Sequence, residues 1–141
     1  MMQPTAGQSP QDFWEGLYRG AGRQTRGQPS AMLERFATDR TPGRALDLGC
    51  AKGDDAIWLA QQDWDVVAVD IAQAALDIAA ANAAESGVSD RISFARHDLA
   101  MSFPDGRFDL ISAMFLQTPF DFPKRQSLRR HLTSLHLAAC C

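Results

Sequence analysis

The sequence contains little cysteine, no long apolar run and no excess of positive charge. Its 141 residues include three cysteines, Cys50, Cys140 and Cys141, whose positions give neither a disulfide framework nor the C-x-x-C spacing of a zinc site. The polar segment Met1–Gln11 lacks the basic start and apolar centre of a signal peptide, and no apolar run reaches membrane-spanning length. These absences predict a protein of the reducing cytoplasm, with no membrane partner and no metal site.

The net charge of -3 argues against a nucleic-acid partner for the molecule as a whole. The charge is unevenly spread, because residues 1–123 hold 10 basic and 17 acidic side chains, whereas residues 124–141 hold 4 basic and no acidic ones. A solvated helix face accounts for the basic segment without a binding role. The length suits one domain with its own core, and a hydrophobic content of 45% is typical of globular chains.

Strands are predicted to alternate with helices from residue 44 onward. We expect strands at residues 44–48, 65–70, 91–95 and 108–114, and helices at residues 55–62, 72–85 and 123–137. Two shorter helices are expected before them, at residues 11–18 and 31–38. This alternation predicts an α/β fold, a Rossmann-like parallel sheet with right-handed crossovers and helices on both faces. In such sheets ligands bind beyond the carboxyl ends of the strands.

The most informative segment, ALDLGCAKGDD at residues 45–55, is typical of a buried strand, a glycine turn and the start of a helix. Its two glycines permit a close approach of backbone to ligand. Asp54 and Asp55 occupy the positive end of the helix, where a dinucleotide fold binds pyrophosphate, and Asp47 adds a third negative charge. The G-x-G-x-x-G spacing of dinucleotide folds is absent too. The segment therefore favours a positively charged cofactor, although an ordinary strand-loop-helix turn of another α/β protein has the same pattern.

This segment resembles the first motif of the class I (Rossmann-like) S-adenosylmethionine-dependent methyltransferases, in which alternating glycines follow an acidic residue. The pattern here is Asp47-x-Gly49-x-Ala51-x-Gly53, with alanine in place of the middle glycine. A small residue is still expected to fit the turn. The resemblance implies that S-adenosylmethionine is the cofactor, and that Asp47, Gly49, Cys50, Ala51 and Gly53 form the loop that binds it.

Further positions match cofactor contacts of that family. Asp70 ends the second strand, where a carboxylate accepts hydrogen bonds from ribose hydroxyls, and it is equally placed to cap the next helix. Ile71 is expected to pack on the adenine ring. Asp98 and Leu99 follow the third strand, where the family binds adenine through an acidic side chain and its neighbour's backbone; an ordinary surface loop would also explain Asp98. Phe115 leaves the fourth strand and is expected to wall the methionine or substrate region.

The segment FWEGLYR at residues 13–19 is unusually rich in aromatic side chains. Similar small-molecule methyltransferases, of the thiopurine and tellurite-resistance types, place an aromatic N-terminal segment over the cofactor. Trp14 and Tyr18 lie four residues apart on one helix face, and an aromatic face attracts a sulfonium by cation–π interaction. The two residues are therefore candidates for a lid over cofactor or substrate, although a helix that simply packs on the core would carry the same side chains.

The resemblance covers roughly residues 13–130. The family continues with three more strands, but its glycine-rich turn and fifth strand are not recognisable after Pro123. We therefore expect a single, incomplete domain with about four strands in the order 3-2-1-4, missing the C-terminal strands of the family. It would comprise an N-terminal lid helix and loop (1–29), a cofactor-binding core (30–123), and a basic helix with an atypical tail (124–141). The fourth strand would be an exposed edge open to self-association.

The predicted function is transfer of a methyl group from S-adenosylmethionine to a small-molecule acceptor that the sequence does not identify. The sequence does not identify a catalytic residue, because in-line methyl transfer can proceed by positioning and exclusion of water alone. Two alternatives stay open, a non-catalytic fragment that binds the cofactor or a partner, and a nucleotide-dependent oxidoreductase. Binding without turnover would indicate the first, and tighter binding of NAD the second.

Overall fold

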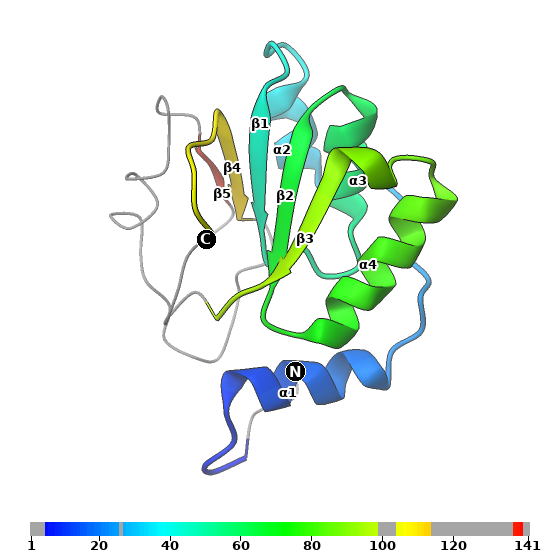
Figure 1. Cartoon of the computed structure of the whole chain (residues 1–141), viewed down its shortest axis with the longest axis vertical. Helices are drawn as coiled ribbons and strands as arrows, with labels where there is room; N and C mark the ends of the chain where they lie inside the picture. Colours follow the sequence, from blue (N-terminus) through cyan, green and yellow to red (C-terminus); the bar gives the residue numbers. More distant parts are fainter. Residues whose placement is uncertain (1–4, 26, 99–103, 114–136, 140–141) are drawn as a thin grey trace.

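The computed structural model describes residues 5–25, 27–98, 104–113 and 137–139, the last range by its backbone only. The elements follow the order expected from the sequence (Figure 1). The helices are α1 (Pro10–Arg19), α2 (Ala31–Ala37), α3 (Asp54–Gln61) and α4 (Gln73–Glu85), and a 3-10 helix covers Ser89–Arg91. The strands are β1 (Arg44–Leu48), β2 (Asp65–Asp70), β3 (Ile92–Arg96), β4 (Leu110–Ala113) and β5 (Leu137–Ala139).

These strands form one parallel sheet in the order β3-β2-β1-β4-β5. The predicted order 3-2-1-4 is confirmed. The expectation that the fourth strand is an exposed edge is wrong, because residues 111–113 of β4 pair with residues 137–139 of β5. The edge on which self-association was predicted is therefore covered along those residues. A three-residue strand is too short for hydrophobic alternation to reveal it in a sequence.

Most of the helix predicted at residues 123–137 lies outside the described residues, and so does Met114 at the end of the predicted fourth strand. Leu137, where that helix was expected to end, instead begins β5.

Helix ends follow the signals in the sequence. The side chain of Ser9 accepts a hydrogen bond from the backbone N–H of Asp12 at the start of α1, and Ser30 caps α2 by accepting from the N–H of Leu33. Gly87 follows α4 with a φ of 75°, a left-handed conformation that glycine adopts without strain. Local chemistry therefore sets where these helices begin and end.

Alternation along the strands divides the core between the two faces of the sheet. On one face, Ala45 and Val66 belong to a buried cluster that also contains residues of α2, α3 and α4. On the other, Leu46 and Val69 pack in a second cluster with Phe108. Within the described part of the chain, helices contribute residues to the first cluster alone. The described residues therefore do not show the helix predicted on the second face of the sheet.

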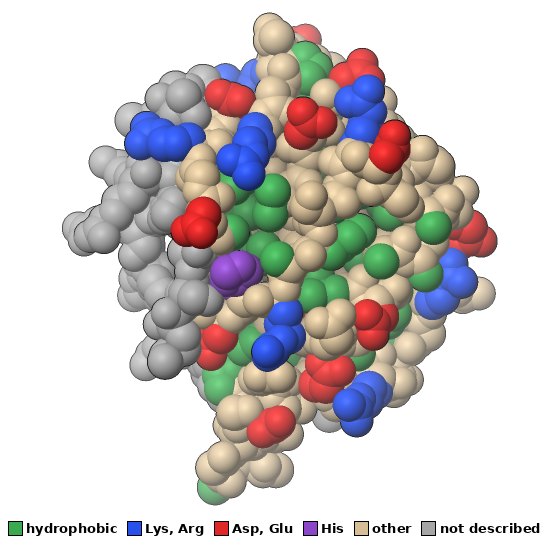
Figure 2. Space-filling model, viewed as in Figure 1, with side chains coloured by type: hydrophobic (Ala, Val, Ile, Leu, Met, Phe, Trp, Pro, Cys, Tyr) green, Lys and Arg blue, Asp and Glu red, His purple; other side chains and the backbone are tan. Residues whose placement is uncertain are grey.

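Helix α1 lies across the carboxyl ends of the first three strands and beside the start of α4 (Figure 1). Figure 2 shows the face of the molecule seen in Figure 1, where positive and negative side chains are interspersed around hydrophobic side chains near the centre. Among the described helices, none is long and apolar enough to cross a membrane. The fold thus places the N-terminal helix over the edge where ligands bind in parallel sheets.

Candidate functional site

The predicted cofactor loop joins β1 to α3 and turns through three residues with left-handed backbone. Gly49, Ala51 and Gly53 have φ values of 67°, 51° and 96°. An alanine in this conformation costs roughly 1–2 kcal/mol, so Ala51 fits the turn, as expected, but under strain. A Cβ on Gly53 would lie 3.0 Å from the Cβ of Ala79 in α4. Glycine is therefore required at position 53 both by the left-handed backbone and by the close approach of α4.

Asp70 holds this loop at the end of β2. One carboxylate oxygen accepts from the N–H of Ala51 at 3.0 Å, and the other accepts from the N–H of Ala72, before α4, also at 3.0 Å. Asp70 therefore binds the N–H of the residue before α4, but it is not the N-cap residue of that helix, which is Ala72. A carboxylate has about four acceptor positions; the N–H groups of Ala51 and Ala72 take two of them, and the N–H of Ile71 also stabilises this carboxylate. Burial raises the pKa of Asp70, against the opposing effect of these backbone N–H groups. Ile71, expected beneath adenine, follows it and is half-buried.

Asp47 is completely buried, and neither of its carboxyl oxygens has a hydrogen-bond partner among the described residues. Its register partner on β4 is Ser112, whose buried hydroxyl is also without a described partner. Burial raises the pKa of Asp47 well above its ordinary value, and the charges of Asp55 and Asp70 raise it further. Buried polar groups in native proteins are almost always satisfied. The partners of this pair are therefore expected outside the described residues.

The buried charged side chains that the structure describes are all carboxylates: Asp47, Asp55 and Asp70. One oxygen of Asp55, in the first turn of α3, accepts from the backbone N–H of Ser30 at 2.6 Å. Burial raises the pKa of the Cys50 thiol, and the neighbouring charges of Asp70 and Asp47 add to that effect. Cys50 is therefore a packing residue of the loop and no nucleophile. Acidic side chains gathered at the loop favour a cation over a phosphate as its ligand.

Helix α1 packs on the start of α4 through contacts that the sequence did not reveal. The carboxylate of Glu15 accepts from the N–H of Ala74 at 3.0 Å, which caps α4 where its own N-cap residue supplies no side-chain bond. The rings of Trp14 and Tyr18 lie 6.5 Å apart. The pKa of Tyr18 is raised, mainly by burial and further by the neighbouring groups Asp70 and Cys50. The aromatic face of α1 therefore lies near the end of β2.

The remaining predicted residues are only partly brought together. Asp98 is half-buried just after β3, and the N–H of the preceding residue, His97, donates to the backbone oxygen of Asp70 at 3.1 Å. The segment after β3 therefore runs beside the end of β2, as predicted. Leu99 and Phe115 lie outside the described residues.

Two other features bear on ligands. Within the described ranges, no three His, Cys, Asp or Glu side chains gather to hold a metal ion. A groove of about 330 Å³ opens between α3 and α4, lined by Thr25, Trp58, Asn82 and their neighbours. Its lining includes neither Asp47 nor Asp70, so this groove is separate from the place where the predicted cofactor residues meet.

Comparison with known proteins identifies the family. A family model described as a methyltransferase domain matches residues 45–136. The chain belongs to the methyltransferase domain family. The match begins within β1, includes the glycine loop and Asp70, and extends past Pro123 into the segment where the sequence predicted a departure from the family pattern. The family resemblance seen in the sequence is therefore confirmed.

Individual relatives of this methyltransferase domain agree with the family match. The chain is 30% identical over 123 residues to the 2-heptyl-1-hydroxyquinolin-4(1H)-one methyltransferase of Mycobacteroides abscessus, covering 79% of this chain and 54% of the relative. It is 37% identical over 93 residues to the magnesium-protoporphyrin O-methyltransferase of Rhodobacter capsulatus, covering 66% and 40%. The chain thus spans about half the length of the curated relatives that it matches.

A solved structure shows the same fold. The S-adenosylmethionine-dependent methyltransferase of Geobacter sulfurreducens, crystallised with S-adenosyl-L-homocysteine, superposes with a TM-score of 0.56 at 24% identity. The alignment covers 70% of this chain and 41% of that one. At this level of identity the likeness carries the fold, and the ligand is a property of that protein.

Proposed function

We propose that this methyltransferase domain binds S-adenosylmethionine at the carboxyl ends of β1, β2 and β3 and directs its methyl group to a small-molecule acceptor. The observation that carries the proposal is the set of three buried carboxylates around the glycine loop, Asp47, Asp55 and Asp70. A cationic cofactor offsets their mutual repulsion, whereas the phosphates of a dinucleotide would add to it. The N-terminus of α3 also begins with two acidic residues, which disfavours a pyrophosphate there.

The described residues fit this cofactor. In this proposal Asp70 accepts from a ribose hydroxyl, Ile71 offers an apolar surface to adenine, and Asp98 binds the adenine amino group. When bound, the cofactor supplies a methyl group on a positively charged sulfur. The chain's own part is to hold the ligand through the loop and Asp70, and to keep water away with Trp14 and Tyr18 of α1. No acid or base from the chain is required.

The acceptor is proposed as a small molecule because the relatives that cover most of this chain are named for quinolone and porphyrin methylation. The chain shares less than two thirds of their length, so the identity of the acceptor does not carry over from them. A cytoplasmic location agrees with the buried, unpaired thiol of Cys50.

The proposal is tested by calorimetry with S-adenosylmethionine, S-adenosylhomocysteine and NAD on the full chain. We expect binding of the first two and none of NAD. Asp70→Asn removes one carboxylate oxygen, and we expect it to weaken binding by roughly 1–3 kcal/mol, the range for a hydrogen bond to a charged group or one left unmade. Asp77→Asn, on the exposed side of α4, is the matched control and is expected to bind like the wild type.

Each outcome separates the alternatives. Tighter binding of NAD would replace the proposal by a nucleotide-dependent oxidoreductase. Binding of S-adenosylmethionine without methyl transfer to any acceptor of a broad panel would leave a cofactor-binding module. An Asp70→Asn variant that binds as tightly as the wild type would remove Asp70 from the site.

A further inference from the structure

The segment after α1 is hydrogen-bonded to the glycine loop and to the first residue of α3. We call residues 21–25 the strap. The Nζ of Lys52 donates to the backbone oxygen of Gln24 at 3.1 Å, and the hydroxyl of Thr25 donates to the carboxylate of Asp54 at 2.6 Å. Both loop-side partners lie within three residues of Ala51, whose N–H is held by Asp70. The strap therefore contacts the loop at its junction with α3.

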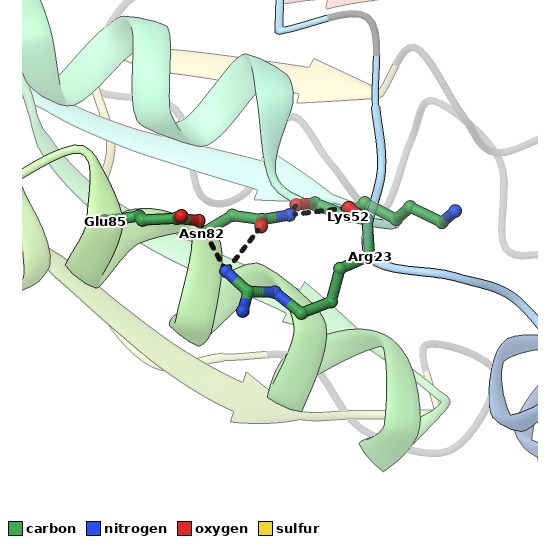
Figure 3. Close-up of polar contacts among 4 residues, drawn as sticks. All are labelled: Arg23, Lys52, Asn82 and Glu85. Atoms are coloured by element: carbon green, nitrogen blue, oxygen red, sulfur yellow. Dashed lines mark hydrogen bonds and ion pairs between the residues drawn. The ribbon is translucent and has the colours of Figure 1, made fainter.

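Asn82 of α4 is the junction of this arrangement (Figure 3). Its side-chain amide donates to the backbone oxygen of Lys52 at 3.0 Å and to that of Arg23 at 3.3 Å. Its amide oxygen accepts from the guanidinium of Arg23 at 3.4 Å, and the same guanidinium nitrogen pairs with Glu85 at 2.5 Å. One amide thus joins the glycine loop, the strap and α4.

These four contacts differ in strength. Arg23 and Glu85 are exposed, with side-chain exposures of 52% and 74%, so their ion pair adds little stability by itself. The bond from Asn82 to Lys52 is partly buried and restrains a backbone carbonyl inside the left-handed turn. Its removal would leave that carbonyl without this partner while the turn still carries the strain of Ala51.

We propose that Asn82 is a positioning residue that holds the glycine loop in its ligand-binding conformation and couples it, through the strap, to the aromatic helix α1. The inference rests on the proposed function, because the ligand of the loop is taken to be S-adenosylmethionine. Asn82 does not contact the ligand; it fixes Lys52, and Lys52 fixes the turn. Loosening Asn82 therefore lowers ligand affinity and frees the strap together.

The test uses the full chain and S-adenosylhomocysteine as probe. In Asn82→Ala we expect the Kd to rise about tenfold, the effect of one to two hydrogen bonds, and trypsin to cut the strap after Arg23 several times faster. Asn82→Asp keeps an acceptor for the guanidinium of Arg23 but loses the donor to the backbone oxygens of both Lys52 and Arg23. It therefore separates the guanidinium contact from the two backbone contacts, and we expect it to weaken binding nearly as much. Asp77→Ala, on the exposed side of the same helix, is the control and should change neither readout.

Circular dichroism at the assay temperature checks that each variant is folded. Because alanine is a better helix former than asparagine, Asn82→Ala is not expected to unfold α4 through helix propensity. A purely structural role would lower the melting temperature while the Kd of the folded variant stays within twofold of the wild type, and that result would overturn the inference. If the wild type binds no S-adenosylhomocysteine, the proposed function fails first and this inference falls with it. If the wild type binds S-adenosylhomocysteine and both Asn82 variants bind it as tightly as the wild type does, only the positioning role is refuted.

Discussion

Substitution of Gly53 by alanine is expected to destabilise the fold at the glycine loop. The residue has a φ of 96°, and an added Cβ would lie 3.0 Å from the Cβ and 3.2 Å from the Cα of Ala79. The left-handed backbone costs an alanine roughly 1–2 kcal/mol, and overpacking against a helix backbone typically costs about 1–3 kcal/mol. We therefore expect a loss of roughly 2–5 kcal/mol in the free energy of unfolding, a large part of the ~5–15 kcal/mol of a typical domain.

Urea unfolding followed by circular dichroism measures this loss, and two variants divide it into its parts. Gly87 also has a left-handed φ, 75°, but nothing lies within 4 Å of its added Cβ, so Gly87→Ala reports the backbone cost alone. Ala79→Gly removes the side chain that the new methyl group would meet. In a double-mutant cycle, Ala79→Gly should therefore recover part of the Gly53→Ala loss. A Gly53→Ala variant no less stable than Gly87→Ala would refute the close approach of α4 to the loop.

Three further predictions concern the buried charge and the lid. The pKa of Asp47 is raised by burial, then by Asp55 and Asp70, so the folded state holds a proton that the unfolded state releases above about pH 4. The contribution of this group to stability is full below that pH and is lost as the pH rises toward the folded pKa. In urea titrations, the stability of Asp47→Asn relative to the wild type should therefore increase with pH. A relative stability that instead falls with pH would contradict the assignment. Glu15→Ala removes the cap of α4 and should cost about 1 kcal/mol, with faster hydrogen exchange in the first turn of α4; unchanged exchange there would argue against the contact. In a variant with the other two tryptophans replaced by phenylalanine, Trp14 fluorescence should respond to S-adenosylhomocysteine, and a flat titration at saturation would reduce α1 to ordinary packing.

Much of the fold could be predicted because its signals are local. The strand before the glycine loop carries an acidic residue next to its last position, and the two loop glycines stand where the chain needs a left-handed backbone. Ser30 and Gly87 mark helix ends by their own chemistry. Alternation of apolar strands with helices fixed the parallel order of the first four strands. β5 was missed because three residues carry no usable period, and it covered the edge that the sequence left exposed.

The sequence placed the glycine loop and Asp70 together at the strand ends but did not show how they are connected, and their binding role stays a prediction. The sequence by itself determined which carboxylates and glycines meet at the strand ends, since the position of each residue within its strand or turn places it there. Only the tertiary structure decided that Asp70 holds the N–H of Ala51, that Glu15 caps a helix 59 residues away, and that Asn82 ties Lys52 to the strap. Such contacts depend on how whole elements pack against one another, and no local propensity or spacing records that.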